Sequence, residues 1–344
     1  MRRRFRLILG TIFVLSVIFI LISLNALAKF SHQLGQPTNY FFKLAYQAAQ
    51  ENPYLNKDKI NFLILGEDKR DDQLEKTEVT DTIILASLNL KDYKLNMVSL
   101  PRDLWSYSLE SKINDIYPQS LEKGDKFPFI KEEFGKITGQ EIDHVLLIST
   151  DNLIKFTSLI GGVDVELEQG FADDEYPNPD HIANPDDPSI PVYKTISFTK
   201  GVNHLNETNI TEFVRSRKSA ETASQGGTDI GRIERQQLLI EAIVDKIRNQ
   251  KFIITERSQA IDLYKLWDQE LIKDFGDLEL LQIFTVLNEN IEKVTLNKIE
   301  IPVGLTAKDG LIYHPNYNYQ GQWVFLPSDQ EYQQLHEFIE AEIN

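Results

Sequence analysis

Short apolar runs that end near turn residues recur along the first half of the chain. Residues 60–65, 82–88 and 95–100 form three such runs, the first followed by Gly66 and the third by Pro101. Apolar runs of this length between turn residues are typical of strands that are buried on both faces of a sheet. The pattern therefore predicts three buried strands.

Helical and strand patterns then alternate. A helical stretch around 129–137 leads to a predicted strand at 145–149, and a helix at 151–160, with Asp151 as its N-cap, leads to a strand at 163–167. This alternation predicts a single α/β/α sandwich with a central mixed sheet. A long helix is then predicted at 229–249, and further helices up to about 292. A strand at 298–303 and a terminal amphipathic helix follow.

Residues 170–194 interrupt this order. They contain five prolines and six acidic side chains and show no periodicity. We expect a solvated surface excursion. A lid over a site and a calcium-binding loop are the alternatives, although the carboxylate spacing matches no EF-hand.

The N-terminal segment differs from the rest of the chain. Residues 1–6 contain four arginines, and 7–28 contain no charged side chain. As a helix rising 1.5 Å per residue, 7–28 would span roughly 33 Å, which is enough to cross a membrane. The arginines would keep the N-terminus in the cytoplasm and place the chain after residue 28 outside. A cleavable signal peptide is the alternative, because Ala26-Leu27-Ala28 is an acceptable cleavage site.

Composition excludes several classes of function. The 344 residues include no cysteine, so disulfides, thiolate metal sites and cysteine nucleophiles are excluded. The net charge is −16, and removing the four arginines of 1–6 leaves 32 basic and 52 acidic side chains, a net charge of −20. This charge has the wrong sign for binding a phosphate backbone, so we expect no nucleic-acid partner. A cluster of arginines in such a background indicates an anion site.

Two aspartates lie beside the first two predicted strands. Asp68 follows the first strand, and Asp81 stands at the start of the second. Carboxylates at neighbouring strand ends suit a hard cation such as Mg²⁺ that is held partly by ligand phosphates. Turn capping is the alternative role for both.

Arginines occupy comparable positions. Arg102 and Asp103 directly follow the third strand, where a surface ion pair is the alternative. If the segment around 213–217 is extended, Arg215 and Arg217 project on the same side and repel each other unless an anion lies between them.

The long predicted helix begins with a polar stripe. Asp229, Arg232 and Gln236 share a face with Ile233 and with the isoleucines further along. Such a helix would line a polar pocket at the edge of the core, although Asp229 is also a plausible N-cap. Together with the strand-end residues, this pattern describes a magnesium-assisted, arginine-lined pocket for a phosphate or pyrophosphate.

These residues resemble the LytR-CpsA-Psr (LCP) family of bacterial envelope proteins. The resemblance covers about 59–250 in the order of the family, and the single N-terminal membrane helix agrees with it. The matching segments are 61–68, 80–83, 98–103, 112–114, 142–144, 159–163, 201–206, 214–217 and 229–237.

The resemblance implies an enzyme that transfers a phosphate-linked glycopolymer, such as a teichoic acid or capsule, from a polyprenyl-pyrophosphate carrier to peptidoglycan. Polyprenyl phosphate would leave, and its tail would lie in an apolar cavity between sheet and helices. Asp68 and Asp81 would hold Mg²⁺ as cofactor. The implied catalytic residues are Arg102, Asp103, Arg215, Arg217, Asp229 and Arg232, with Asp103 or Asp229 as base; the implied substrate-binding residues are Lys112, Arg235 and Gln236.

The expected organisation combines the apolar N-terminal run with this resemblance. It comprises a cytoplasmic tail (1–6), a transmembrane helix (7–28) and a helical stalk (29–58). A catalytic domain follows (59–250), and C-terminal helices and a strand (251–344) complete this domain. One position departs from the family pattern: Val79 stands where the family usually has arginine, two residues before Asp81. A non-catalytic lipid-binding or regulatory protein, and a polyprenyl-pyrophosphate hydrolase, therefore remain alternatives.

Overall fold

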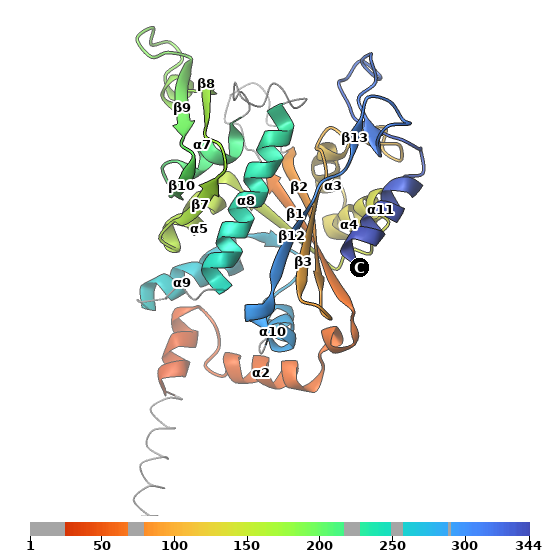
Figure 1. Ribbon diagram of the computed structural model, residues 1–344. Helices are drawn as coiled ribbons and strands as arrows, with labels where there is room; N and C mark the ends of the chain where they lie inside the picture. Colours follow the sequence, from red (N-terminus) through yellow and green to blue (C-terminus); the bar gives the residue numbers. More distant parts are fainter. Residues whose placement is uncertain (1–24, 68–78, 217–227, 249–256, 288–289) are drawn as a thin grey trace, which may run out of the picture.

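A six-stranded mixed sheet forms the centre of the computed structural model (Figure 1). β1 (Lys59–Glu67), β2 (Thr80–Asn89) and β3 (Lys94–Ser99) form an antiparallel meander, and they correspond to the three apolar runs. The sheet order is β11-β6-β1-β2-β3-β12. The structure describes residues 25–67, 79–216, 228–248, 257–287 and 290–344.

Parallel strands flank the meander. β6 (His144–Ser149) is parallel to β1, and β12 (Thr295–Ile299) is parallel to β3. β11 (Ile272–Lys273) adds an antiparallel edge to β6. The predicted central mixed sheet is therefore confirmed.

Helices α3 (Ile116–Leu121), α4 (Lys126–Thr138) and α11 (Gln333–Ile343) cover one face of the sheet. Leu63 and Leu65 of β1 are fully buried in the core beneath them. Because side chains alternate along a strand, the residues between them point to the other face.

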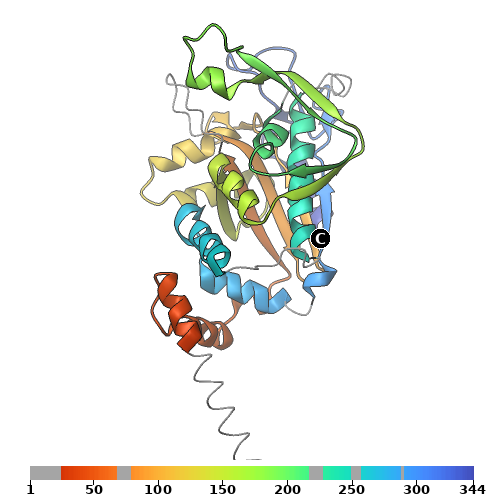
Figure 2. The same ribbon diagram turned by 90° about the vertical axis from the view of Figure 1, so that its left-hand side faces the viewer.

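The other face lies beneath α8 (Thr228–Arg248), which runs along the sheet (Figure 2). A second core joins α8 to α5 (Thr150–Leu159) and α7 (Ile210–Arg215). Strands of two small sheets complete this core; they are β7 (Val163–Leu167) with β10 (Gly201–Leu205), and β8 (Phe171–Pro177) with β9 (Tyr193–Phe198).

The N-cap of α5 differs from the prediction. Ser149 caps this helix: its Oγ accepts from the Asn152 backbone N–H at 3.2 Å, and the Asn152 side chain accepts from the Ser149 N–H in return. Asp151 lies inside the first turn instead, where its negative charge interacts favourably with the positive end of the helix dipole. The prediction of Asp151 was wrong because a better cap, Ser149, ends the preceding strand.

The acidic, proline-rich segment 170–194 is more ordered than its sequence indicates. β8 and β9 pair antiparallel, and α6 (Pro179–Ala183) lies between them. Asp173 of β8 is only 2% exposed, and it accepts a hydrogen bond from Ser216 Oγ at 2.8 Å. Most of the side chains from 174 to 194 are exposed, as expected of a solvated surface excursion, but its backbone is regular because cross-strand pairing does not require strict alternation of polarity.

Several helices pack at the end of the molecule where the described chain begins (Figure 1). Residues 25–33 are helical and are followed by α2 (Tyr40–Gln50) and the short helix η1 (Pro53–Asn56). The helices beside them are α9 (Arg257–Lys265), η4 (Leu266–Glu270) and α10 (Asp277–Leu287). No helix within the described ranges has the length and apolar character needed to span a membrane, and residues 1–24 lie outside them.

Short elements surround the loop after β3. β4 (Trp105–Ser106) pairs with β5 (Ser111–Lys112), and η2 (Ile113–Asp115) follows. From the C-terminal part, β13 (Val303–Gly304), β14 (Ile312–Tyr313) and β15 (Leu326–Pro327) form a small sheet, after the single turn η5 (Ile291–Lys293).

Candidate functional site

The loop after β3 is held by backbone hydrogen bonds from both sides. Leu100 N donates to Ile83 O at 2.9 Å and so extends the pairing of β2 with β3. Asn114 N donates to Arg102 O at 3.2 Å. The C-terminal segment also contributes, because the N–H of Phe325, directly before β15, donates to the carbonyl of Asp103 at 2.8 Å. These bonds fix the backbone from which the Arg102 and Asp103 side chains project.

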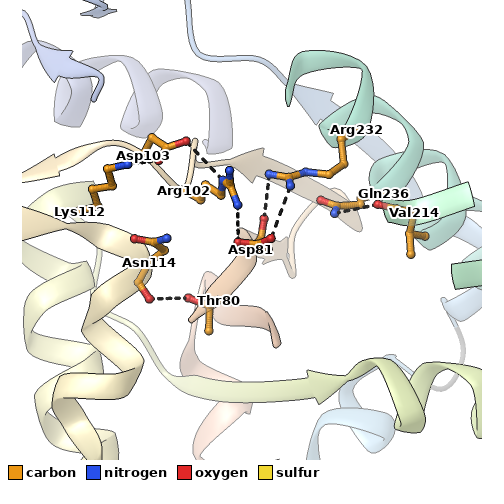
Figure 3. A network of polar contacts seen from close by, with 9 residues as sticks. All are labelled: Thr80, Asp81, Arg102, Asp103, Lys112, Asn114, Val214, Arg232 and Gln236. Atoms are coloured by element: carbon orange, nitrogen blue, oxygen red, sulfur yellow. Dashed lines mark hydrogen bonds and ion pairs between the residues drawn. The ribbon is translucent and has the colours of Figure 1, made fainter. Parts of the chain in front are cut away.

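Asp81 is the centre of the site (Figure 3). Arg102 Nη1 donates to Asp81 Oδ1 at 2.6 Å. Arg232 reaches the same residue from α8, with Nη1 3.6 Å from Asp81 Oδ2 and Nη2 donating to the Asp81 carbonyl at 3.4 Å. The exposed fractions of these side chains are 10% for Asp81, 20% for Arg102 and 4% for Arg232. The structure therefore brings together two guanidiniums that lie far apart in the sequence.

Asp103 holds two cations beside this centre. Lys112 Nζ donates to Asp103 Oδ1 at 2.6 Å, and Arg102 Nε donates to Asp103 Oδ2 at 3.3 Å (Figure 3). The Asp103 side chain is only 7% exposed. Because both of its oxygens accept hydrogen bonds from neighbouring cations, Asp103 positions Arg102 and Lys112.

The first turns of α8 line a small pocket against the sheet. Arg232, Ile233 and Gln236 form the helical wall, and Asp81, Arg102 and residues of β2 and β3 form the other. Gln236 Nε2 donates to Val214 O at 3.4 Å. The cavity volume of this pocket is only about 10 Å³, room for about one water molecule, so the side chains that line it lie close together. The predicted polar start of the helix is therefore confirmed for the side chains that the structure describes.

Arg235 does not line this pocket. Its guanidinium lies 4.5 Å from the centre of the Phe171 ring, and it donates to the carbonyls of Phe213 (3.0 Å) and Ser216. Arg235 is 5% exposed, and this burial lowers its pKa to about 10. The structure thus places Arg235 behind the chain segment that carries Arg215, where it holds the backbone and does not face the site.

Arg215 is the last residue of α7 and is half-buried. The extended geometry considered for this segment is wrong up to Arg215, because residues 210–215 are helical. The positions of Asp68 and Arg217 and the side chain of Asp229 lie outside the described part of the chain.

Asp81 has the donor chemistry that Mg²⁺ prefers, since it offers carboxylate oxygens beside cations that would bind phosphate. In the structure both of its oxygens face guanidiniums. A cation on Asp81 therefore requires that Arg102 and Arg232 turn toward the ligand phosphates. Among the described residues there is no group of three or more His, Asp or Glu side chains that would hold a metal alone. Asp81 therefore fits a metal only if a bound phosphate supplies further ligands and draws the arginines away.

Sequence reasoning missed some residues that position the site. Thr80 Oγ1 donates to Asn114 O at 3.4 Å and joins the start of β2 to η2 (Figure 3). On α8, Gln237 Nε2 donates to Ser99 Oγ at 2.8 Å, and this buried contact fixes the helix on β3. The signal that would have identified Gln237 is a polar residue four positions after Ile233, on the core-facing side of the predicted helix, since a buried polar group needs a partner.

The apolar face between the two cores is incompletely covered. Ile64 of β1 and Leu146 and Ile148 of β6 point to the α8 side of the sheet and remain half-buried. Ile84, on the neighbouring strand, is 1% exposed and lines the pocket. An apolar surface therefore continues from the arginine site along the sheet.

The mixed sheet, with an arginine–carboxylate pocket where β2 begins and β3 ends, defines an α/β protein with a site suited to phosphate-type anions. A comparison with family models identifies the family itself. The model of the LytR_cpsA_psr family matches residues 27–339, so the chain belongs to this family.

Curated relatives are transferases by name. The polyisoprenyl-teichoic acid–peptidoglycan teichoic acid transferase TagU of Oceanobacillus iheyensis is 27% identical over 215 residues, which are 61% of this chain and 58% of that protein. The corresponding transferase TagV of Bacillus subtilis is 27% identical over 176 residues, 49% of this chain and 39% of TagV. The aligned part of this chain thus spans less than two thirds of the length of each.

Solved structures share the fold. The crystal structure of B. subtilis TagV has a TM-score of 0.56 at 18% identity and covers 84% of this chain and 98% of the TagV chain. The structure of TagT bound to LIIa-WTA has a TM-score of 0.54 at 16% identity and covers 83% and 91%. These likenesses show the fold.

Proposed function

We propose that the protein is an extracytoplasmic phosphotransferase that moves a phosphate-linked glycopolymer from a polyprenyl-pyrophosphate carrier to peptidoglycan or a similar envelope acceptor. Membership of the family and the names of the curated relatives support this proposal. The observation that carries it is the convergence of Arg102 and Arg232 on Asp81 at the beginning of β2. Arginine forks bind phosphate oxygens in pairs and spread the charge that develops during phosphoryl transfer.

The reaction needs positioning and charge stabilisation more than covalent chemistry from the protein. An acceptor hydroxyl oxygen attacks the phosphorus attached to the glycopolymer. The bond from this phosphorus to the bridging oxygen breaks, and polyprenyl phosphate leaves. Arg102 and Arg232 exchange Asp81 for pyrophosphate oxygens, while Asp103 keeps Arg102 and Lys112 in place. The hydroxyl proton passes to a carboxylate, for which Asp229 is a candidate.

We propose Asp81, together with Asp68, as the residues that hold Mg²⁺. The metal would neutralise charge on the pyrophosphate oxygens. Turning Arg102 and Arg232 toward the phosphates would expose the Asp81 oxygens that now face them. Metal and phosphate would therefore bind together.

We propose that the carrier tail follows the half-buried apolar side chains Ile64, Leu146 and Ile148 away from the arginines. The pocket beside Asp81 would widen to take the pyrophosphate when Arg102 and Arg232 turn away from Asp81 toward the ligand. The uncharged run 7–28 with four arginines before it supports a single membrane anchor with a cytoplasmic N-terminus. In this arrangement a membrane carrier and the site lie on the same side of the membrane.

The test is turnover of a lipid-linked glycopolymer by the full chain in nanodiscs with Mg²⁺. Mass spectrometry would follow the release of polyprenyl phosphate and the product on a peptidoglycan fragment. Arg102→Ala and Arg232→Gln are expected to lower turnover about 100-fold or more, because each removes charge stabilisation from the transition state. Lys298→Ala, which removes a cation from an exposed ion pair, is the matched control. Turnover unchanged in both site variants would refute the site, and release without coupling to the acceptor would identify a hydrolase.

A second candidate function is a non-catalytic polyprenyl-phosphate binder or regulator. Val79, half-buried directly before β2, favours it, because the family usually has arginine there. Restoring this charge with Val79→Arg separates the two functions. If the protein is a binder, it retains carrier lipid during purification and shows no turnover. Turnover by the wild-type protein excludes this role.

A further inference from the structure

Helix α2 presents an apolar face to solvent. Phe42 and Tyr46 are 49% and 65% exposed, and Ala45 and Ala49 are also exposed. These four residues are spaced as i, i+3, i+4 and i+7, so they lie along one side of the helix. Ala48, which points away from this side, is buried. This outer face of α2, formed by residues 42, 45, 46 and 49, is covered by no described part of the chain.

The orientation of α2 is fixed by polar contacts to α10 and its neighbours. Tyr40 Oη donates to Asp277 Oδ2 at 2.5 Å, at the start of the helix. Beyond its other end, Asn52 Nδ2 donates to the carbonyl of Gln282 at 2.8 Å. Because both ends are attached to α10, the outer face cannot turn inward without breaking these contacts.

The charge around α2 differs from that of the rest of the chain. Residues 29–50 contain Lys29 and Lys43 and no acidic side chain, whereas 51–344 contain all 52 acidic and 30 basic side chains, a net charge of −22. Lys43 is exposed and lies about 100° around the helix from Phe42, at the flank of the outer face. An apolar, aromatic stripe without acidic side chains beside it suits a helix that lies on a membrane surface, and the flanking lysine favours anionic lipids.

The position of α2 agrees with its charge. The helical residues 25–33 lead into it, and α2 crosses the end of the molecule beside them (Figure 1). Phe42 therefore lies only a short distance along the chain from the uncharged run 7–28. On the adjacent helix α10, Leu280 and Phe284 are exposed by 45% and 48%. Large apolar and aromatic side chains thus gather where the chain leaves its apolar N-terminal run.

We infer that α2 is a membrane-surface helix whose outer face inserts into the boundary between head groups and acyl chains of an anionic bilayer. The aromatic side chains occupy the interface, and Lys29 and Lys43 contact lipid phosphates. Because α2 is attached to α10, its docking fixes the angle at which the whole domain meets the membrane.

The membrane-surface helix is inferred without the proposed function; only its consequence for the carrier lipid rests on that function. β1 begins three residues after η1 and ends beside the arginine site, and nine strand residues span about 30 Å. With α2 on the membrane, the apolar surface along β1 and β6 runs from the bilayer toward the site. A carrier tail thus spans this distance while its end stays in lipid.

The absence of cysteine from the chain permits a direct test, because a single introduced cysteine can be labelled alone. Ala45→Cys and Ala49→Cys place a nitroxide on the outer face, and Gln47→Cys is the matched control, exposed and about 140° from Phe42. The full chain is reconstituted in nanodiscs of phosphatidylglycerol and phosphatidylcholine. Electron paramagnetic resonance then compares the accessibility of each label to oxygen, which enriches in lipid, and to a water-soluble nickel chelate.

We expect the oxygen-to-nickel accessibility ratio at positions 45 and 49 to exceed that at 47 about twofold or more. Replacing both aromatics, Phe42→Ser with Tyr46→Ser, should reduce this difference. Equal, water-like ratios at all three positions overturn the inference. Dipolar broadening between labels at position 45 on two molecules, without lipid contact, also overturns the inference, because the outer face of α2 would then bind a second copy of the chain.

The same samples separate this inference from the proposed function. Arg102→Ala should abolish transfer and leave the label at position 45 in lipid. If the label lies in lipid and wild-type protein shows no transfer, the membrane helix stands and the proposed function fails. If transfer proceeds while the labels stay in water, the inference fails by itself.

Discussion

Asp81→Asn tests the electrostatics of the site most directly. Asparagine keeps the shape of the side chain and removes the charge that faces two guanidiniums. Arg232, 4% exposed, then loses a partner at 3.6 Å, and Arg102 loses one at 2.6 Å. Removing one member of a buried ion pair costs about 3–5 kcal/mol, because the remaining charge stays buried.

The structure places the expected loss at the lower end of that range. Arg102 is partly exposed and keeps its contact with Asp103. We therefore expect the free energy of unfolding to fall by about 3 kcal/mol. Because the entropy of unfolding is about 2.1 cal/mol/K per residue, a 344-residue chain loses about 1.4 °C per kcal/mol, and the melting temperature falls by about 4 °C.

Pyrophosphate should restore stability to the variant. In metal-free buffer, pyrophosphate competes with Asp81 for both arginines in the wild type, and in Asp81→Asn it does not. At 100 times its dissociation constant a ligand stabilises the folded state by about 2.7 kcal/mol. The variant is therefore expected to gain more from a given pyrophosphate concentration than the wild type gains.

Urea unfolding followed by the fluorescence of buried tryptophan, with and without pyrophosphate, measures both effects. Glu241→Gln is the matched control, because it makes the same chemical change in the exposed pair with Lys298 and should cost under about 0.5 kcal/mol. A loss below about 1 kcal/mol in Asp81→Asn, or equal gains from pyrophosphate, would show that Asp81 does not neutralise buried arginines.

Three further predictions concern the support of the site. Arg235→Lys removes the fork that reaches two backbone carbonyls and should cost about 2–4 kcal/mol in urea unfolding, so unchanged stability would contradict its structural role. Gly66→Ala puts a Cβ 2.7 Å from Thr82 Cβ and should lower transfer activity by displacing β2, whereas Gly124→Ala, with no atom within 4 Å, should not. Burial lowers the pKa of His144 below its usual 6.5, so the unfolded chain binds a proton more readily than the folded chain. The free energy of unfolding should therefore fall as the pH drops below 6.5, by up to about 1.4 kcal/mol per pH unit. Urea midpoints at several pH values check this, and an identical fall in His144→Gln would assign it to other groups.

Local patterns were sufficient to predict the main elements. The apolar runs became β1, β2 and β3 because each is short, continuous and bounded by turn residues. The polar start of α8 placed Arg232 and Gln236 at a pocket, because helical spacing alone decides which side chains share a face. The charge of −20 outside the arginine tail singled out clustered arginines as an anion site.

The tertiary structure decided what each arginine contacts. Arg232 and Arg235 lie one helical turn apart; helical spacing put Arg232 on the pocket side but did not indicate what either side chain contacts. Arg232 meets Asp81, whereas Arg235 meets Phe171 and two carbonyls, because different elements pack against the two positions. Likewise, the hydrogen bond from Phe325 to the Asp103 carbonyl joins two segments that are remote from each other in the sequence. The sequence determined which side chains the site has available, and long-range packing determined which of them face it.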